Sequence, residues 1–438
     1  MKKSLLVKAA GLALGATLVF TGCASGNLAN GSATSDAVWN DPTGSLAGVT
    51  LNFGGGTVKG PIDQVITAFE AKTGVTIKRV TYPDPYEQSL LTKVAVGDKP
   101  DLAAWQPTAS ELTALQASTN LLSLDGAPWL DKLDPALKDV TGILDNTRYA
   151  ALVTSPSVMG VYYNKDVFAK AGITAAPKNW SEFVADASKI KATGTTPFFE
   201  AGGSQWPTQW WVQVQLAEKA KAGLWDDINT NKKQFTSPDV QTAIDNYNTL
   251  INQGLFNPDI KTATFDDQST ALLAGSTGIV LQVNALLEQL QLKATSAELD
   301  AKLGWFPISA DGVTATSIPD NKNGIVAFKS GDPKREAAAR QFLTFWMTTD
   351  YADFIAASNS VSIEPSVPTP SGVPQLAKTI SASLADSVGS MQSQAIANPD
   401  LYINLANMIQ GTVTPVQVAE TTQNQFAQLA KAQGAAGF

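Results

Sequence analysis

Hydrophobic and polar residues follow two different periods in the chain after residue 45. Val49 to Phe53 alternates apolar and polar positions, which is the period of a half-buried strand. Thr73-Gly74 ends a predicted helix whose apolar positions recur at helical spacing: Ile62, Val65, Ile66 and Phe69. Further strands are expected at Thr76–Val80 and Leu102–Trp105. Strands and helices in this order predict an α/β domain with a largely parallel sheet.

The same alternation of short strands and longer helices continues along the chain. Apolar, β-branched runs predict strands at Val158–Asn164, Gly278–Leu281 and Ile325–Phe328. Asn179 and Glu182 have the spacing of a capping box and predict the start of a helix. Other helices are expected at Lys165–Lys170, after Ser237-Pro238 and between Asp332 and Asp350. The roughly 400 residues of this patterned region exceed what one hydrophobic core usually supports, so two domains are expected.

The first residues have the pattern of an export signal. Two lysines at positions 2 and 3 precede an apolar stretch, Ala9 to Phe20, which is too short to span a bilayer comfortably. The stretch ends at Thr21-Gly22-Cys23, and small residues before a cysteine are typical of a bacterial lipoprotein signal. We therefore expect residues 1–22 to be removed and Cys23 to carry a lipid. Residues 23–44 are rich in small polar residues and are expected to form a flexible tether.

The composition excludes several classes of function. Cys23 is the only cysteine, so neither an internal disulfide nor a cysteine-based zinc site is possible. The chain has no histidine, which removes the usual Ser/His triads and histidine-ligated metals, and we expect no metal and no cofactor. The net charge of −8 offers no attraction to nucleic acid. Ten tryptophans with modest charge suit a neutral, partly apolar ligand.

One segment in the middle of the chain carries a family resemblance. Residues 160–198 read GVYYNKDVFAKAGITAAPKNWSEFVADASKIKATGTTPF. Four flanking segments follow in the order of the same family: residues 68–80 (AFEAKTGVTIKRV), 97–105 (GDKPDLAAW), 271–282 (ALLAGSTGIVLQ) and 325–350 (IVAFKSGDPKREAAARQFLTFWMTTD). Together they make the chain similar to the extracellular solute-binding proteins of carbohydrate ABC importers, the group related to maltose-binding protein.

The resemblance implies an α/β fold of two lobes, a periplasmic-binding-protein-like clamp with three crossings between the lobes. It places the first lobe at residues 45–163 and 313–356, and the second lobe at 164–312 and 357–438. A carbohydrate would bind between the lobes, and hinge closure would bury it. The implied partners are the permease subunits of an ABC transporter, and the protein would be a monomer outside the cytoplasm, at the cell surface or in the periplasm, held to the membrane through Cys23.

Candidate ligand contacts are residues that could stack on a sugar ring or accept its hydroxyls. Trp206 is the position most similar to the stacking aromatic of the family. It lies in a segment rich in Trp and amide side chains that begins at Glu200, which is itself a candidate ligand contact. Trp210 and Trp211 are expected in the core. Trp105 and Gln106 match the place of another cleft aromatic, and the sequence fits a core role for Trp105 equally well.

Other positions have two interpretations each. Gly55 and Gly56 fit a close approach of backbone to ligand, or an ordinary turn. Asp84 and Glu87 fit hydroxyl acceptors, or a solvated proline-rich turn. Two asparagines near predicted strand ends complete the candidate set: Asn284 and Asn323. The motif Tyr163-Asn164-Lys165-Asp166 is expected at a lobe crossing, and the core is expected to hold three further tryptophans: Trp180, Trp305 and Trp346.

Three alternatives to a sugar clamp remain open at this point. A surface glycoside hydrolase would need two facing carboxylates, for which Glu200 and Asp84 are the candidates. A clamp for a peptide, a polyamine or an oxyanion would share the fold, although oxyanion sites usually present Arg or helix N-termini. An adhesion protein would share only the lipid anchor.

Overall fold

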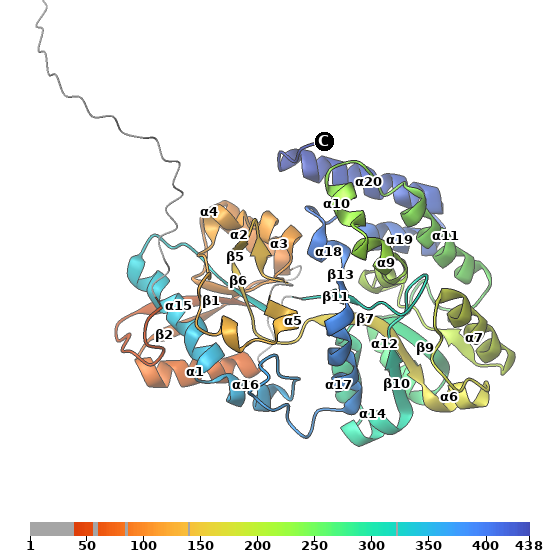
Figure 1. The fold of residues 1–438 in the computed structure, drawn as a ribbon, viewed down its shortest axis with the longest axis horizontal. Coiled ribbons are helices and arrows are strands. Elements are labelled where there is room, and N and C mark those ends of the chain that lie inside the picture. The colour runs from red at the N-terminus through yellow and green to blue at the C-terminus, as the bar shows by residue number, and fades with distance from the viewer. Residues whose placement is uncertain (1–38, 56–59, 84–85, 139–140, 321–322) are drawn as a thin grey trace, which may run out of the picture. The chain divides into compact units, whose positions relative to one another are not determined.

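The computed structural model describes residues 39–55, 60–83, 86–138, 141–320 and 323–438 (Figure 1). Residues Ala37–Phe438 form one compact unit. The predicted signal sequence, Cys23 and most of the predicted tether lie outside the described residues. Within the described ranges, every helix is too short or too polar to cross a membrane.

The first sheet has five strands in the order β2-β1-β3-β12-β6. Their bounds are Thr76–Thr81, Thr50–Gly55, Leu102–Ala104, Gly324–Ala327 and Ala150–Leu152. β1 pairs in parallel with β2 and β3, whereas β12 is antiparallel to β3 and to β6. Four of the five strands therefore run in one direction, as expected for a largely parallel sheet, and only β12, which enters from a later part of the chain, runs the opposite way.

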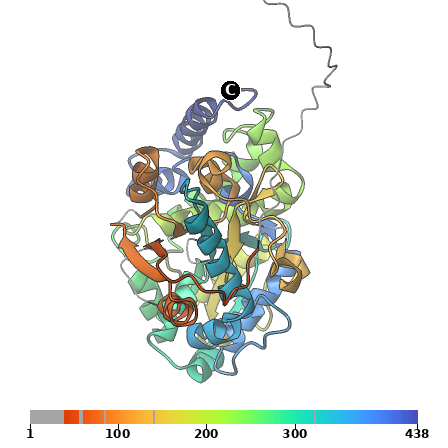
Figure 2. The same cartoon turned by 90° about the vertical axis from the view of Figure 1, so that its left-hand side faces the viewer.

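Helices pack against both faces of this sheet (Figure 2). α15 lies beside α1, and it contacts β1 and β12. α1 ends at Gly74, whose φ of 73° is in the left-handed region that favours glycine, as the sequence predicted. The helices of this region are α1 (Pro61–Thr73), α2 (Tyr86–Ala95), α3 (Ala109–Ala114), α4 (Ala117–Asn120), η1 (Leu130–Lys132), α5 (Pro135–Lys138), α15 (Pro333–Thr348) and α16 (Tyr351–Ser358).

The second sheet has six strands around β7 (Ser157–Asn164). β9 (Thr277–Gln282) pairs with one edge of β7 and carries β8 (Thr196–Phe198) beyond it. The other edge of β7 pairs with two successive strands, β10 (Leu303–Phe306) and β11 (Thr316–Ile318). β13 (Val388–Gly389) completes the sheet beside β11. A two-stranded ladder, β4 (Ile143–Leu144) with β5 (Thr147–Arg148), stands apart from both sheets.

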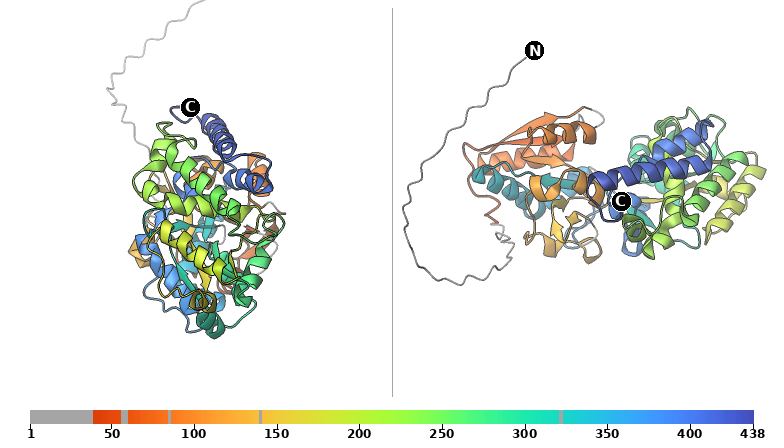
Figure 3. Two further views of the ribbon diagram at one scale, coloured as in Figure 1. Left: turned by 90° about the vertical axis from the view of Figure 1, so that its right-hand side faces the viewer. Right: turned by 90° about the horizontal axis from the view of Figure 1, so that it is seen from above.

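The helices around the second sheet include the longest of the described residues. α20 (Pro415–Ala432) lies against α11 (Pro238–Asn252), as the contacts between the two helices and Figure 3 show. The others are α6 (Lys165–Lys170), α7 (Trp180–Ala192), η2 (Trp206–Gln209), α8 (Trp210–Gln213), η3 (Val214–Leu216), α9 (Ala217–Lys221), α10 (Leu224–Asn229), α12 (Phe265–Ala274), α13 (Ala285–Gln291), α14 (Ser296–Lys302), α17 (Gln375–Ala382), η4 (Ser383–Asp386), α18 (Met391–Gln394) and α19 (Leu401–Gln410).

The predicted helix start at Asn179 is confirmed with one difference. The Asn179 side chain accepts a hydrogen bond from the backbone N–H of Glu182 at 3.0 Å. The Glu182 carboxylate accepts a hydrogen bond from the backbone N–H of Lys178, one residue before the cap, at 2.9 Å. The Asn179 side chain therefore satisfies one of the free N–H groups of the helix, while the Glu182 side chain satisfies an N–H group that precedes the cap.

The fold is the expected α/β arrangement of two lobes, and we define each lobe by the sheet it contains. The chain changes sheet between β6 and β7 and again between β11 and β12. A third crossing lies between α16, which packs on α1, and α17, which packs on β10. Strand membership puts the first crossing between residues 152 and 157 and the second between 318 and 324, compared with the limits at 163 and 313 that the resemblance implied.

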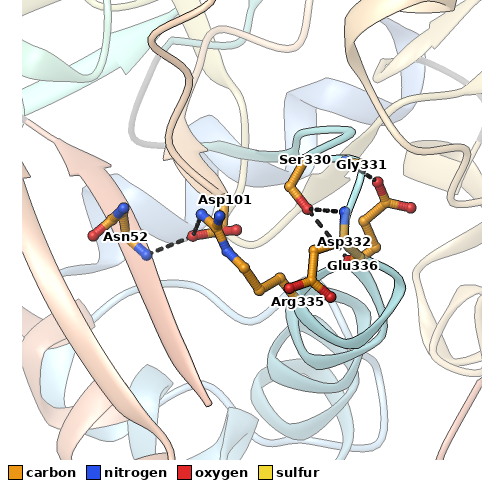
Figure 4. A network of polar contacts seen from close by, with 7 residues as sticks. All are labelled: Asn52, Asp101, Ser330, Gly331, Asp332, Arg335 and Glu336. Carbon is orange, nitrogen blue, oxygen red and sulfur yellow. Dashed lines mark hydrogen bonds and ion pairs between the residues drawn. The ribbon is translucent and has the colours of Figure 1, made fainter.

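One buried carboxylate connects three elements of the first lobe (Figure 4). Asp101 is 1% exposed, and its Oδ2 accepts hydrogen bonds from the backbone N–H of Asn52 at 2.7 Å and from Arg335 Nη2 at 2.8 Å. The backbone N–H of Asp101 donates to the carbonyl of Asn52 at 2.9 Å. Since Asn52 lies in β1 and Arg335 in α15, this carboxylate holds the first turn of the helix on the sheet (Figure 4).

Candidate functional site

One contact between the two lobes joins α3 of the first lobe and α18 of the second, and another joins α5 and η4. The Ser110 hydroxyl in α3 donates a hydrogen bond to the backbone carbonyl of Gln392 in α18 at 2.8 Å, across 282 residues of sequence. Both residues are buried. Polar side chains from several other elements gather around this contact, which makes it the candidate functional site.

A network of three buried glutamines lies on the second-lobe side of the contact: Gln209, Gln213 and Gln392. Gln209 Oε1 accepts hydrogen bonds from Gln213 Nε2 at 3.1 Å and from Gln392 Nε2 at 2.7 Å. Gln209 Nε2 donates to the carbonyl of Trp206 at 3.1 Å. Gln213 Oε1 accepts from the backbone N–H of Met391 at 3.0 Å. The network thereby joins η2, α8 and α18.

Trp206 opens η2 and is half-buried. Its ring packs against Trp210 and Phe265, with ring centroids 6.0 Å and 4.9 Å away. The loop before it approaches another segment so closely that a Cβ on Gly202 would lie 2.3 Å from the Ile260 carbonyl oxygen. A glycine is therefore needed for this loop to lie against residues 260–263, and the loop in turn positions Trp206.

Carboxylates of the first lobe lie near polar side chains of the second. Burial and, to a smaller extent, the charge of Glu87 raise the pKa of Glu111 to about 7, and a hydrogen bond with Asn398 opposes this shift. Burial likewise raises the pKa of Tyr402, to which the charges of Asp400 and Glu87 add. The Thr208 hydroxyl donates to the Tyr402 carbonyl at 2.9 Å and so joins α19 to η2.

Three predicted contacts form hydrogen bonds that connect the segments between the lobes. Gln106 Nε2 donates to the carbonyl of Pro319 at 2.8 Å. Asn284 Oδ1 accepts from the backbone N–H of Val158 at 3.0 Å. Asn323 Nδ2 donates to the hydroxyl of Thr154 at 2.8 Å and to the carbonyl of Ser155 at 3.0 Å. These bonds give Asn323 and Asn284 a structural role at the crossings, while Gln106 remains half-buried near one of them.

Two other predicted contacts have no exposed surface. The Trp105 indole packs in the core of the first lobe, and its Nε1 donates to the Glu111 carbonyl at 3.1 Å. The Glu200 carboxylate accepts hydrogen bonds from the Ala201 backbone N–H at 2.7 Å and from the Tyr247 hydroxyl at 3.0 Å. Burial raises the pKa of Glu200 to about 7. Both environments favour a core role for these side chains.

The remaining predicted positions divide between the described residues and those outside them. Gly55 is buried at the end of β1, where a Cβ would lie 3.2 Å from Arg79 Nη2. Glu87 is half-buried in the first turn of α2. Gly56 and Asp84 lie outside the described residues. The predicted core positions Trp180, Trp210, Trp211, Trp305 and Trp346 are all buried.

Several residues of this site were not among the sequence predictions: Glu111, Gln209, Gln213, Gln392, Asn398 and Tyr402. Gln209 and Gln213 carry a weak signal, since they are polar residues four apart within an otherwise apolar helical run and so lie on one helix face. Gln392 lies in a polar stretch, Ser390 to Gln394, that resembles an ordinary surface turn. Only the fold brings it to α3.

The chain is similar to known bacterial binding proteins. The model of the bacterial extracellular solute-binding protein family matches residues 55–353. A protein of Brucella abortus (strain 2308), whose name calls it a binding protein and states no ligand, is 26% identical over 318 residues, 67% of this chain and 74% of that protein. The multiple sugar-binding protein of Streptococcus mutans is 27% identical over 156 residues, 35% of this chain and 36% of that protein.

The fold is also similar to solved structures. A chitin oligosaccharide binding protein superposes with a TM-score of 0.71, covering 87% of this chain and 99% of that chain at 21% identity. This likeness extends over both sheets and confirms the two-lobe fold.

Proposed function

Because the chain belongs to the family of bacterial extracellular solute-binding proteins, we propose that it captures a sugar or oligosaccharide outside the cytoplasm and delivers it to an ABC-type importer. The observation that carries the proposal is the family match over residues 55–353. A carbohydrate ligand is supported by the printed names of two similar proteins, one a multiple sugar-binding protein and the other a chitin oligosaccharide binding protein.

The chemistry at the contact between the lobes suits a neutral sugar. Sugar hydroxyls need hydrogen-bond partners, and the C–H faces of a sugar ring pack well on aromatic rings. The site holds amides, carboxylates and aromatic rings close together, among them Gln209, Glu111 and Trp206. We place the ligand between the lobes, with Trp206, Gln106 and Glu87 retained from the sequence predictions as contacts.

The proposed mechanism is binding coupled to closure of the lobes. The lobe limits 45–163 with 313–356 and 164–312 with 357–438 remain a proposal, and the sheet memberships suggest hinges near residues 153–156 and 319–323. A sugar that prefers the closed form shifts the population toward it, and the importer would recognise that form. We expect the protein to act as a monomer with permease subunits as partners, and light scattering would reveal any larger assembly.

We also propose that binding is not followed by catalysis. Members of this family are binding proteins, and Glu200, one of the two carboxylates considered for a hydrolase, is completely enclosed among core residues. Product formation during incubation with oligosaccharides would overturn this part of the proposal.

A thermal-shift screen of the full chain tests the ligand class. We expect one sugar among galactose, maltotriose, raffinose and N,N′-diacetylchitobiose to raise the melting temperature by several degrees, because a ligand that binds only the folded state stabilises it by about 2.7 kcal/mol at a concentration of 100 Kd. Amino acids, peptides and polyamines serve as controls. A response among these controls with none among sugars would remove the carbohydrate assignment and leave the family intact.

The variant Trp206→Ala belongs to the same screen, since it tests where the sugar binds. Loss of the aromatic surface should weaken the binding of the responding sugar by about 1–3 kcal/mol. Trp346→Phe, in a tryptophan buried on α15 of the first lobe whose ring packs against Phe342 and Phe354, is the matched control. An affinity equal to that of the wild type would remove Trp206 from the site.

We propose that Cys23 anchors the protein to the membrane through a lipid. The proposal rests on the export signal that precedes this only cysteine. Cells producing the wild-type chain should incorporate labelled palmitate into the protein and retain it in the membrane fraction, whereas Cys23→Ser should lose both. Equal labelling of the two proteins would exclude this anchor.

A further inference from the structure

Gln392 has one amide atom without a hydrogen-bond partner in the part of the chain that the structure describes. The side chain is 4% exposed, and its Oε1 has no hydrogen-bond partner among the described residues. A buried amide oxygen in this condition destabilises the folded state, because it has lost its hydrogen bond to water. Most buried polar side-chain atoms in proteins are paired, and Gln392 Oε1 is one of several exceptions among the described residues.

The orientation of the Gln392 amide follows from its neighbours. The backbone N–H of Met391 requires an acceptor and fixes Gln213 Oε1 toward itself, so Gln213 Nε2 faces Gln209. At the other end, the carbonyl of Trp206 requires a donor and fixes Gln209 Nε2 toward itself. Gln209 Oε1 is thereby left as an acceptor.

This order of donors and acceptors decides which atom of Gln392 stays unpaired. Gln392 must present its Nε2 to Gln209 Oε1, which it does at 2.7 Å. Exchanging the two amide atoms would set two carbonyl oxygens against each other. The unpaired atom is therefore an acceptor, and the backbone of Met391 and Trp206 determines this rather than a choice of rotamer.

Gln392, which carries this acceptor, forms hydrogen bonds with residues of both lobes. Its backbone carbonyl accepts the Ser110 hydroxyl from the first lobe, and its side chain belongs to the glutamine network that begins at the Trp206 carbonyl. Only a donor can satisfy the free oxygen, and a sugar hydroxyl is a donor.

We infer that Gln392 is a ligand-contacting and specificity-determining residue, whose Oε1 accepts a hydrogen bond from one hydroxyl of a bound sugar. The inference rests on the proposed function and adds to it a named acceptor, held in place by an amide network. A sugar lacking that hydroxyl would leave the oxygen unpaired and bind less tightly.

Two isosteric substitutions in the same network separate this role from a structural one. Gln392→Met removes an amide whose oxygen has no partner, and Gln209 keeps Gln213 as a donor, so the melting temperature should not fall. Gln213→Met leaves the Met391 N–H without its acceptor, so its melting temperature should fall. Each full-length variant is compared with the wild type, alone and with the responding sugar of the screen.

The affinity of Gln392→Met for that sugar should be about 2- to 12-fold weaker, which is the loss of one neutral hydrogen bond. Monodeoxy derivatives of the same sugar give the decisive readout: one of them should bind wild type more weakly than the parent sugar does, and bind Gln392→Met as well as the parent does. Gln392→Asn, which withdraws the oxygen by one methylene, should behave in the same way as Gln392→Met.

The possible results are distinguishable. If wild type binds none of the sugars, the proposed function fails. If wild type binds a sugar and Gln392→Met and Gln392→Asn bind it equally well, Gln392 is not a contact and the proposed function stands. If both variants lose stability as Gln213→Met does, or discriminate the deoxy derivatives as wild type does, Gln392 has a structural role and the inference is overturned.

Discussion

Replacing Asp101 by Ala is expected to lower the free energy of unfolding by about 3 kcal/mol, as measured by chemical denaturation of the full chain. The variant loses the charge-assisted bond from Arg335, and it leaves the backbone N–H of Asn52 without its acceptor at the contact between β1 and β3. Arg335 is 34% exposed and can be rehydrated, so the loss comes mainly from the backbone N–H and the buried position.

The chain offers a matched control for Asp101 in the same loop. Asp98 is also paired with a cation, Lys93, at 3.0 Å, but the two side chains are 69% and 53% exposed. Asp98→Ala should therefore change stability by less than about 0.5 kcal/mol. Asp101→Asn keeps an acceptor for Asn52 and should fall between the two alanine variants. Equal denaturation midpoints for Asp101→Ala and Asp98→Ala would show that the buried carboxylate does not hold α15 on the sheet.

Local patterns predicted most elements of the fold because their signals lie within a few residues. Alternation identified β1, helical spacing identified α1, and Gly74 marked its end. The direction of a strand was harder to predict from the sequence. β12 has the pattern of any buried strand, and it is antiparallel to β3 only because the chain reaches it after the second crossing. A short strand carries no record of which neighbour it will pair with, so the sequence did not reveal that β12 runs against the other four strands of its sheet.

The site was harder to predict than the fold because its residues come from distant parts of the chain. Trp206 stands out as an aromatic residue in a polar loop, whereas Gln392 meets Ser110 only across 282 residues. Trp105 and Glu200 show the converse problem. Their residue types suit sugar binding, but their side chains turn into the core, and strand ends do not reveal which way a side chain points.

Glu200 provides the second large prediction, which concerns stability as a function of pH. Burial raises the pKa of this carboxyl from 4.5 to about 7 in the folded chain. Between these two values the folded state holds a proton that the unfolded state has released, so this group makes stability fall as the pH rises from about 4.5 to 7. Above that window both states are ionised, and the accumulated loss is roughly 3 kcal/mol.

Glu200→Gln removes the titration while keeping the shape of the side chain. The amide oxygen can accept from the Ala201 N–H, and the Tyr247 hydroxyl can accept from the amide nitrogen. The variant should therefore gain stability relative to wild type by roughly 3 kcal/mol between pH 4 and pH 8, as measured by denaturation at each pH.

Comparing the two proteins at each pH isolates Glu200 from other groups that titrate in the same range. Burial also raises the pKa of Glu111 to about 7 and that of Asp350 to about 6, and both contribute equally to wild type and variant. Tyr247→Phe removes a donor that favours the ionised carboxylate, so the pH-dependent loss of stability should extend to higher pH than in the wild type. A constant difference between Glu200→Gln and wild type from pH 4 to pH 8 would mean that Glu200 is ionised in the core as readily as in the unfolded chain. That result would require a stronger stabilisation of the Glu200 carboxylate than the Ala201 N–H, the Tyr247 hydroxyl and the Trp211 indole supply.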